Sequence, residues 1–269
     1  DQIFWLIVTN ISENQGFTKE RVESRQIEIE KVIDTSVDNS TELIMDETFN
    51  FLPSSTSRAI YEHKGYTLSY VEEHEQAEWV AYYLQSSDFS SVNYDRPYFN
   101  QDPLVSTKSA DWRNYKNSGY NKGHLCPAGD RKSTYKLYEE TFLTSNASPQ
   151  LYDFNAGIWN RLEQKTRYWA EKNKGVYVVT GGVLGENLKT IGKENVSVPK
   201  YFYKILLTKD GKNMIGFLLP HKNSEKALYE FVVSVDSIEK MTGIDFFPSL
   251  EDEMESGLES NSNYKKWSF

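Results

Sequence analysis

The clearest pattern of apolar and polar positions lies in the second half of the chain. Residues 176–180 form a continuous apolar run, which is typical of a buried strand, ahead of a Gly-Gly pair that we interpret as a turn. Residues 201–207 and 213–219 flank a Lys-Asp-Gly-Lys sequence and predict a β-hairpin. This region therefore predicts antiparallel sheet.

The region before it is more mixed. Residues 66–71 alternate between apolar and polar side chains, which predicts a half-buried strand. Residues 75–84 fit either a strand or a short helix that packs its aromatic side chains inward. Residues 86–107 are rich in Ser, Asn, Asp and Pro and predict a long irregular loop. Loops of that length inside compact domains are usually functional or disordered.

Helical periodicity is clearest over residues 151–172, which are followed by an Asn-Lys-Gly stop signal. The apolar stripe of this helix consists of Ile158, Leu162 and Trp169. Residues 224–242 are expected to be largely helical, and residues 251–259 to form a surface helix or loop. Together the patterns predict a mixed fold of helices and mostly antiparallel sheet.

Length and composition fit a globular protein. The chain has 269 residues, of which 38% are hydrophobic, and no run approaches the ~20 apolar residues of a membrane span. Residues 1–48 carry 11 acidic and 4 basic side chains and are treated as an acidic appendage to a domain over residues 49–269. The apolar residues 3–8 fit a strand or the remnant of an export segment. Cys126 is the only cysteine, which excludes an intramolecular disulfide and a cysteine-based metal cluster.

Charge is distributed unevenly. The net charge is −9, yet residues 108–174 hold 12 basic and 7 acidic side chains, a net of +5. A locally basic face on an acidic body can engage phosphates, because screening limits exposed charges to a reach of ~10 Å. Charge alone equally fits an uneven solvated surface.

Candidate chemistry centres on the segment from Tyr120 to Asp130, which reads Tyr-Asn-Lys-Gly-His-Leu-Cys-Pro-Ala-Gly-Asp. His124 lies between Gly123 and Pro127, so it is expected where a strand end enters a loop. A histidine can act as a general base near neutral pH, because its ordinary pKa is ~6.5. Taken alone, His124 fits equally a structural histidine.

A second motif lies downstream. Residues 141–150 read Thr-Phe-Leu-Thr-Ser-Asn-Ala-Ser-Pro-Gln. Four side chains at helical spacing follow, on one slanting stripe of the expected helix: Asn155, Trp159, Glu163 and Arg167. An amide, a carboxylate and a guanidinium on one ridge could hold a hydrated divalent cation and a phosphate. The alternative is an ordinary exposed face with a Glu–Arg pair worth only ~0.2–0.5 kcal/mol.

Together, these two motifs and the Asn-x7-Glu-x3-Arg spacing resemble the DNA/RNA non-specific endonuclease family, which includes endonuclease G and secreted bacterial nucleases. The resemblance covers about residues 58–260. It implies an α+β, ββα-metal (His-Me finger) nuclease fold with a central, mostly antiparallel sheet. It also implies a phosphodiester hydrolase that uses Mg²⁺, with Mn²⁺ as a compatible substitute.

The resemblance assigns a role to each matching residue. His124 would be the general base, Asn155 the direct protein ligand of Mg²⁺, and Glu163 would orient metal-bound waters. The other implied roles fall on three residues: Asn146 would position the active-site backbone, Arg167 would support the phosphate, and Arg96 would steady the transition state.

The chain departs from the family pattern at two positions. The usual Asp-Arg-Gly-His is here Asn121, Lys122, Gly123 and His124. Lys122 keeps the positive charge but loses the bidentate fork of arginine, so its phosphate contact would be weaker. Asn121 lacks a carboxylate that would anchor the loop. This departure favours one alternative, a degenerate nuclease fold that only binds nucleic acid or another protein.

A second alternative is a phosphodiesterase or phosphatase for small substrates. For a nuclease, the expected partners are DNA and RNA, bound through the backbone without strong sequence preference. The resemblance is also compatible with a homodimer and with an inhibitor protein. Because such an enzyme would endanger its own cytoplasm, we expect a secreted, periplasmic or cell-envelope location.

Overall fold

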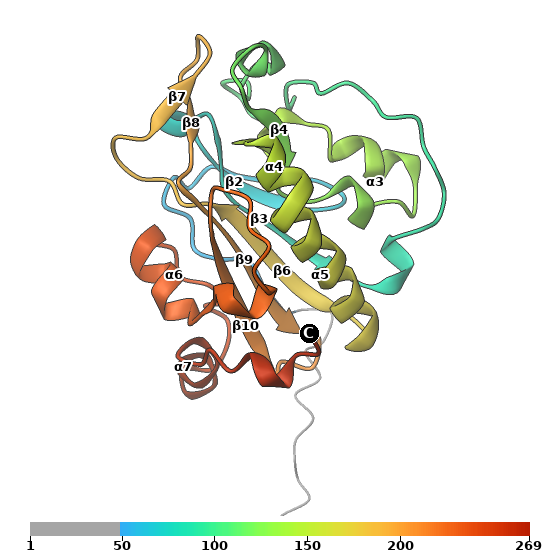
Figure 1. The fold of residues 1–269 in the computed structure, drawn as a ribbon, viewed down its shortest axis with the longest axis vertical. Helices are drawn as coiled ribbons and strands as arrows, with labels where there is room; N and C mark the ends of the chain where they lie inside the picture. Colours follow the sequence, from blue (N-terminus) through green and yellow to red (C-terminus); the bar gives the residue numbers. More distant parts are fainter. Residues whose placement is uncertain (1–48) are drawn as a thin grey trace, which may run out of the picture. The chain divides into compact units, whose positions relative to one another are not determined.

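The computed structural model describes residues 49–269, which are built around a seven-stranded sheet. The strand order is β1-β2-β3-β6-β9-β10-β11, and every neighbouring pair is antiparallel (Figure 1). The strands are β1 Ile60–Glu62, β2 Thr67–Val71, β3 Gln76–Leu84, β6 Val176–Gly182, β9 Tyr201–Thr208, β10 Met214–Pro220 and β11 Val232–Val233. Two separate two-stranded antiparallel sheets pair β4 Asn121–His124 with β5 Ala147–Gln150, and β7 Lys189–Ile191 with β8 Val196–Val198.

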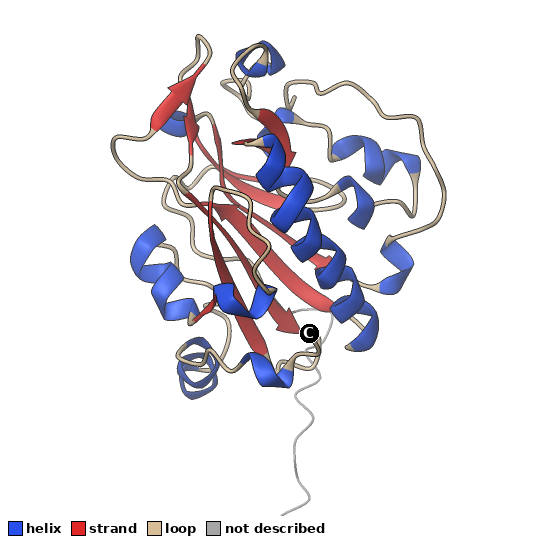
Figure 2. Cartoon of the chain, in the orientation of Figure 1, coloured by secondary structure: helices blue, strands red, loops and turns tan. Residues whose placement is uncertain are grey.

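Helices lie on both sides of the sheet (Figure 2). They are α3 Tyr135–Glu140, α4 Tyr152–Phe154, a π-helical segment Asn155–Trp159, α5 Asn160–Lys172, α6 Val235–Thr242 and α7 Asp252–Glu259. In Figure 1, α5 crosses the sheet diagonally, while α6 and α7 lie at its lower left. The expected α+β fold with a mostly antiparallel sheet is confirmed.

The two faces of the sheet carry separate cores, as the two-residue period of a strand requires. In β9, Phe202 and Leu206 join Leu162 and Trp169 of α5 in one cluster. The intervening Tyr203, Ile205 and Leu207 join Val235 and Ile238 of α6 in the other. Burying a large apolar side chain contributes ~1.5–3 kcal/mol relative to exposure. The central strands are therefore apolar throughout because both faces are covered.

The expected continuous helix over residues 151–172 is bent near its start. Gly157 has non-helical angles (φ −96°, ψ −110°) inside the π-helical segment. A Cβ atom on Gly157 would lie 2.1 Å from Oδ1 of Asn223, and that oxygen accepts a hydrogen bond from the backbone N–H of Ile158 (3.2 Å). The bend therefore makes room for a side chain from a distant loop. π-Helical turns of this kind are frequent at functional sites.

Two further expectations need correction. Residues 224–242 contain the 3-10 helix Leu228–Phe231 and α6, as expected for a largely helical segment, but Val232 and Val233 between them pair with β10 at the sheet edge. The β-branched Val-Val pair suits a strand, and the exposed edge of β10 supplies its partner. The Gly-Gly pair after residue 180 belongs to β6 rather than to a turn, because the Tyr203 ring and Pro199 pack where Cβ atoms would project. Residues 75–84, for which strand and helix were both open, form β3.

The expected acidic appendage over residues 1–48 lies outside the described residues. Among the residues from 49 onward, no helix has the length and apolar content needed to cross a membrane.

Candidate active site

His124 is the last residue of β4 and pairs with Ala147 of β5. Its ring packs against the rings of Phe99 and Phe142, with centroid distances of 5.1 and 4.9 Å. The Nε2 atom is buried and has no hydrogen-bond partner among residues 49–269. Burial, together with the positive charge of Arg96, lowers the pKa of His124 to about 3. The imidazole is therefore held in its neutral form.

Two cations lie around the same pair of phenylalanines. The guanidinium carbon of Arg96 is 5.4 Å from the ring centroid of Phe142, and Nζ of Lys122 is 5.5 Å from that of Phe99. Arg96 is exposed, and burial together with the charge of Arg96 lowers the pKa of Lys122. The structure thus brings Arg96, from a long loop, next to His124. Two positive side chains around a neutral histidine suit an anionic ligand.

Asn146 holds the turn that follows His124. Its Oδ1 accepts a hydrogen bond from the backbone N–H of Cys126 (2.8 Å), and its Nδ2 donates to the carbonyls of Cys126 and Thr141 (both 2.9 Å). The backbone N–H of Leu125 also donates to the Asn146 carbonyl (3.0 Å). Because Asn146 is fully buried, these bonds are protected from water and fix the backbone on the C-terminal side of His124.

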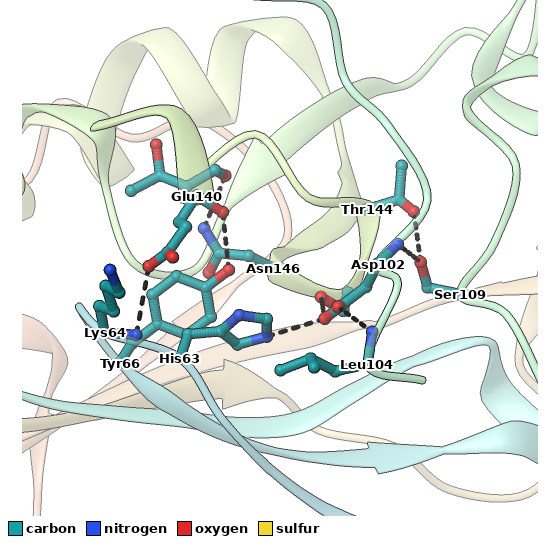
Figure 3. Close-up of polar contacts among 11 residues, drawn as sticks. His63, Lys64, Tyr66, Asp102, Leu104, Ser109, Glu140, Thr144 and Asn146 are labelled. Atoms are coloured by element: carbon teal, nitrogen blue, oxygen red, sulfur yellow. Dashed lines mark hydrogen bonds and ion pairs between the residues drawn. The ribbon is translucent and has the colours of Figure 1, made fainter. Parts of the chain in front are cut away.

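The loop that carries Arg96 is anchored by the buried Asp102 (Figure 3). Oδ2 of Asp102 accepts hydrogen bonds from His63 (2.8 Å) and from the Ser145 hydroxyl (2.6 Å). The backbone N–H of Asp102 donates to Oγ of Ser109 (2.6 Å), which also bonds the Thr144 hydroxyl (2.7 Å). Burial alone would raise the pKa of Asp102, but the bonds from His63 and Ser145 bring it below its ordinary value. The loop is thereby tied to the segment that contains Asn146.

The helix opposite carries the other expected residues. Asn155 is half-buried at the start of the π-helical segment, and its side chain has no hydrogen-bond partner within the described part of the chain. Glu163 is half-buried in the first turn of α5. Burial raises the pKa of Glu163 to about 7, against the opposing effect of the Lys204 cation. The protonated form of this carboxyl is therefore easier to populate than in an exposed glutamate.

Arg167 already has a partner within the chain. Its Nη1 donates to Oδ1 of the fully buried Asp130 at 2.6 Å, and the Tyr82 hydroxyl donates to the other carboxylate oxygen at 2.9 Å. Asp130 closes the segment that begins at His124, so this ion pair docks that segment onto α5. The Glu163–Arg167 pair, which the alternative of an ordinary exposed face required, is not among the ion pairs of residues 49–269.

Two other histidines, His63 and His221, are held by hydrogen bonds inside the protein rather than lying free on the surface. The His63 side chain is only 4% exposed, as part of the Asp102 network. His221 bonds the Pro199 carbonyl through Nδ1 (2.9 Å) and accepts from the backbone N–H of Leu151 through Nε2 (2.8 Å). Burial lowers the pKa of His221 below its ordinary value. His221 thus holds the start of the helix that carries Asn155.

The donor set fits a hard divalent cation. An unpartnered amide oxygen at Asn155 and a carboxylate at Glu163 lie on one helix, and oxygen ligands with several retained waters are what Mg²⁺ prefers. Cys126 is fully buried, and burial raises the pKa of its thiol to about 12, so it fits packing rather than metal binding.

Sequence reasoning missed two buried charges beside this helix. Asp130 was quoted within the first motif, but nothing in a single sequence pairs it with Arg167. Lys204 occupies a fully buried position on β9. Its signal was present, since it is the one charged residue in the run Tyr-Phe-Tyr-Lys-Ile-Leu-Leu-Thr of that strand.

Comparison with known proteins agrees with the geometry. The family model for DNA/RNA non-specific endonucleases matches residues 48–253. The chain is 33% identical over 235 residues to the human protein "Nuclease EXOG, mitochondrial", covering 80% of this chain and 63% of the relative. It is 31% identical to "Nuclease C1" of Cunninghamella echinulata var. echinulata, covering 77% of this chain and 89% of the relative.

The zebrafish (Danio rerio) "Nuclease EXOG, mitochondrial" is 34% identical over 226 residues, and 66% of its length is covered, so the chain spans about two thirds of these vertebrate relatives. A solved structure of the EndoG/EndoGI complex superposes with a TM-score of 0.67 at 28% identity, covering 72% of this chain and 88% of the other. Because the family model covers most of the chain and a relative of 31% identity is matched over 89% of its length, the chain belongs to the DNA/RNA non-specific endonuclease family.

Proposed function

We propose that this protein is a Mg²⁺-dependent endonuclease that hydrolyses phosphodiester bonds in DNA and RNA without sugar specificity. The observation that carries the proposal is the state of His124, which is held neutral beside the cations Arg96 and Lys122. A neutral imidazole can take a proton from water, and adjacent cations can stabilise the charge that develops on a phosphate. The names of the relatives, all nucleases, support the same activity.

Each side chain then has a distinct task. His124 accepts the proton of the attacking water through Nδ1, because Nε2 is buried in the protein. Arg96, exposed and free to follow the substrate, supports the phosphate in the transition state, and Lys122 contributes a weaker contact. Asn146 keeps the backbone after His124 in place. The remaining guanidinium nitrogens of Arg167 support the phosphate while Nη1 stays bound to Asp130.

The metal would be held by Asn155 as the direct protein ligand, with Glu163 accepting hydrogen bonds from its coordinated waters. When bound, it supplies Lewis acidity toward the phosphate and the leaving oxygen. Glu163 must be ionised to act as an acceptor only. In-line attack would leave a 5′-phosphate and a 3′-hydroxyl.

The decisive test is cleavage of plasmid DNA and of RNA by wild type and His124→Ala, each with Mg²⁺ and with EDTA. His74→Ala is a matched control, because His74 bonds Ser197 and no residue to which a catalytic role is assigned. We expect cleavage by wild type and by His74→Ala with Mg²⁺, and a loss of at least ~100-fold in His124→Ala. Full activity in His124→Ala refutes the mechanism. Binding of nucleic acid without cleavage by wild type would instead identify a degenerate nuclease fold, and cleavage of a model diester alone a small-substrate phosphodiesterase.

Recognition through the backbone predicts that affinity falls steeply with salt, because bound cations displace counterions from the phosphates. The solved EndoG/EndoGI complex concerns inhibition of EndoG, which supports a protein inhibitor as a partner of this chain as well. We also propose that the protein forms a homodimer, which sedimentation of the full chain tests. We further propose that it is located outside the cytoplasm, which fractionation of the source cells tests.

A further inference from the structure

A groove of about 570 Å³ opens between the 3-10 helix Trp112–Tyr115 and the turn that joins β7 to β8. In Figure 1, β7 and β8 lie near β4, the strand that ends at His124. None of the charged side chains of the groove has a part in the chemistry proposed at His124. Six of them line it: Asp111, Arg113, Lys116, Lys189, Lys193 and Glu194.

The two walls of the groove are joined by the buried Asn114. Its Oδ1 accepts a hydrogen bond from the backbone N–H of Glu194 (3.1 Å), and its Nδ2 donates to the Glu194 carboxylate and to the Asp111 carbonyl (2.8 Å). Gly192 allows this close approach, because it has a positive φ (70°) and a Cβ atom there would lie 2.2 Å from Oδ1 of Asn114. The groove is therefore held in shape before a ligand binds, which lowers the entropic cost of binding.

The carboxylates of the groove are already engaged, whereas three of its ammonium groups have no anionic partner. Asp111 binds the Arg113 guanidinium (2.7 Å), and Glu194 accepts hydrogen bonds from the Asn114 amide and from the Asp111 backbone N–H (2.7 Å). With four cations against two carboxylates, the lining carries a net charge of +2, which suits a phosphate. Three exposed lysines belong to no ion pair within 4.0 Å among residues 49–269: Lys116, Lys189 and Lys193.

Tyr120 connects the groove with the active site. Nζ of Lys189 lies 5.1 Å from the ring centroid of Tyr120 and donates to its hydroxyl at 3.4 Å. Tyr120 directly precedes β4, so the two-residue period of a strand places it on the same face as Lys122 and His124. Four extended residues span ~13 Å, and one strand of B-DNA carries a phosphate every ~3.4 Å of its axis. The near edge of the groove is thus about four phosphates from His124.

Lys122 lies between the groove and His124. Its Nζ is 5.5 Å from the ring centroid of Tyr115, the last residue of the 3-10 helix. It is also 5.5 Å from the ring centroid of Phe99, which packs against the His124 ring. The cations of the groove therefore continue into those of the active site, along the face of β4 that carries His124.

We propose that this groove binds the sugar-phosphate backbone of the substrate about four phosphates from the scissile bond, through Lys116, Lys189 and Lys193. The inference rests on the proposed function, because it requires that the substrate strand passes His124. Contacts to phosphates fix the register of a strand without reading its sequence, so the groove adds affinity and alignment while the reaction takes place at His124. Long nucleic acids should bind more tightly than fragments that end before the groove.

The test measures the Kd of a fluorescent DNA duplex of about 20 base pairs, long enough to reach both sites, in EDTA and at several salt concentrations. The variant Lys116→Gln/Lys193→Gln removes one charge from each wall. Its matched control is Lys209→Gln/Lys212→Gln, two exposed lysines at the turn between β9 and β10.

In Lys116→Gln/Lys193→Gln we expect Kd to rise at least ~10-fold at about 0.1 M salt, and the slope of log K against log salt to fall by about 2. The control variant should match wild type in both. Lys116→Arg/Lys193→Arg keeps both charges and should retain the wild-type Kd. Thermal melts of each variant check that the fold survives these changes of exposed side chains.

Equal Kd values and salt slopes in the groove variant and the control overturn the inference, as does a wild type that binds no DNA. Poly-glutamate that binds wild type more tightly than DNA, and is lost in Lys116→Gln/Lys193→Gln, would identify a site for an acidic protein and also overturn it. Binding in EDTA needs no cleavage. A wild type that binds DNA through these lysines yet never cuts it therefore refutes the proposed function alone.

Discussion

The ion pair between Asp130 and Arg167 should contribute far more to stability than a surface pair of the same length. The Nη1–Oδ1 distance is 2.6 Å, with exposed side-chain fractions of 0% for Asp130 and 23% for Arg167. The Arg113–Asp111 pair is 2.7 Å long, but its side chains are 70% and 27% exposed. Since the two N–O distances nearly match, comparing the two pairs isolates the effect of burial on their contribution to stability.

Replacing Arg167 with Met keeps most of the apolar stem but leaves the Asp130 carboxylate buried without its cation. Breaking a buried pair from one side costs about 3–5 kcal/mol. We expect the lower part of that range, because the Tyr82 hydroxyl and the Lys204 charge still act on Asp130. The corresponding Arg113→Met should cost about 0.2–1 kcal/mol, because water solvates the carboxylate that remains.

The assay is urea unfolding at pH 7 followed by circular dichroism, with thermal melts alongside. For a unit of this size, about 3–5 kcal/mol corresponds to a fall in Tm of roughly 6–20 °C. If Arg167→Met costs no more than Arg113→Met, the argument that burial makes this pair strong is wrong. An unchanged stability would also refute the docking of the loop after His124 onto α5.

Two other predictions concern packing and pH. Gly157→Ala would place a methyl group 2.1 Å from Oδ1 of Asn223. We expect the free energy of unfolding, measured in urea, to fall by about 1–3 kcal/mol and to be partly restored in the double variant with Asn223→Ala. Equal losses with and without Asn223→Ala would contradict this prediction. Burial and neighbouring acidic groups raise the pKa of Glu259 to about 8, so the folded state holds this proton more tightly than the unfolded state. Its stabilising effect is complete below the unfolded pKa of ~4.3 and disappears as pH rises to about 8. Relative to wild type, Glu259→Gln should therefore raise Tm more at about pH 9 than at about pH 5; a shift that does not depend on pH would count against the assignment.

Much of the fold was predictable because the deciding interactions are local. The hairpin of β9 and β10 follows from two apolar runs around a short polar turn with Gly211 at positive φ (69°). The helix over residues 160–172 follows from its apolar stripe. The strand residues Val232 and Val233, within a segment expected to be helical, have the opposite cause, since they pair with the edge that β10 offers.

The features of the candidate site also divide into those that local sequence indicates and those that depend on distant residues. His124, Asn146, Asn155 and Glu163 lie within 40 positions, and the sequence singled them out as candidates through the resemblance of their motifs to a known family. The bend at Gly157 could not be predicted, because the Asn223 side chain that fills it comes from a loop 66 positions later.

By itself, the sequence determined the antiparallel hairpin of β9 and β10, the helix over residues 160–172 and the set of candidate chemical groups, because periodicity and motif spacing act over short distances along the chain. Only the tertiary structure decided the electrostatic state of those groups. Burial together with the Arg96 charge keeps His124 neutral, and burial against the Lys204 charge brings the pKa of Glu163 to about 7. A pKa depends on desolvation and on charges that are distant in sequence, and these are set only when the sheet, the hairpin and α5 pack together.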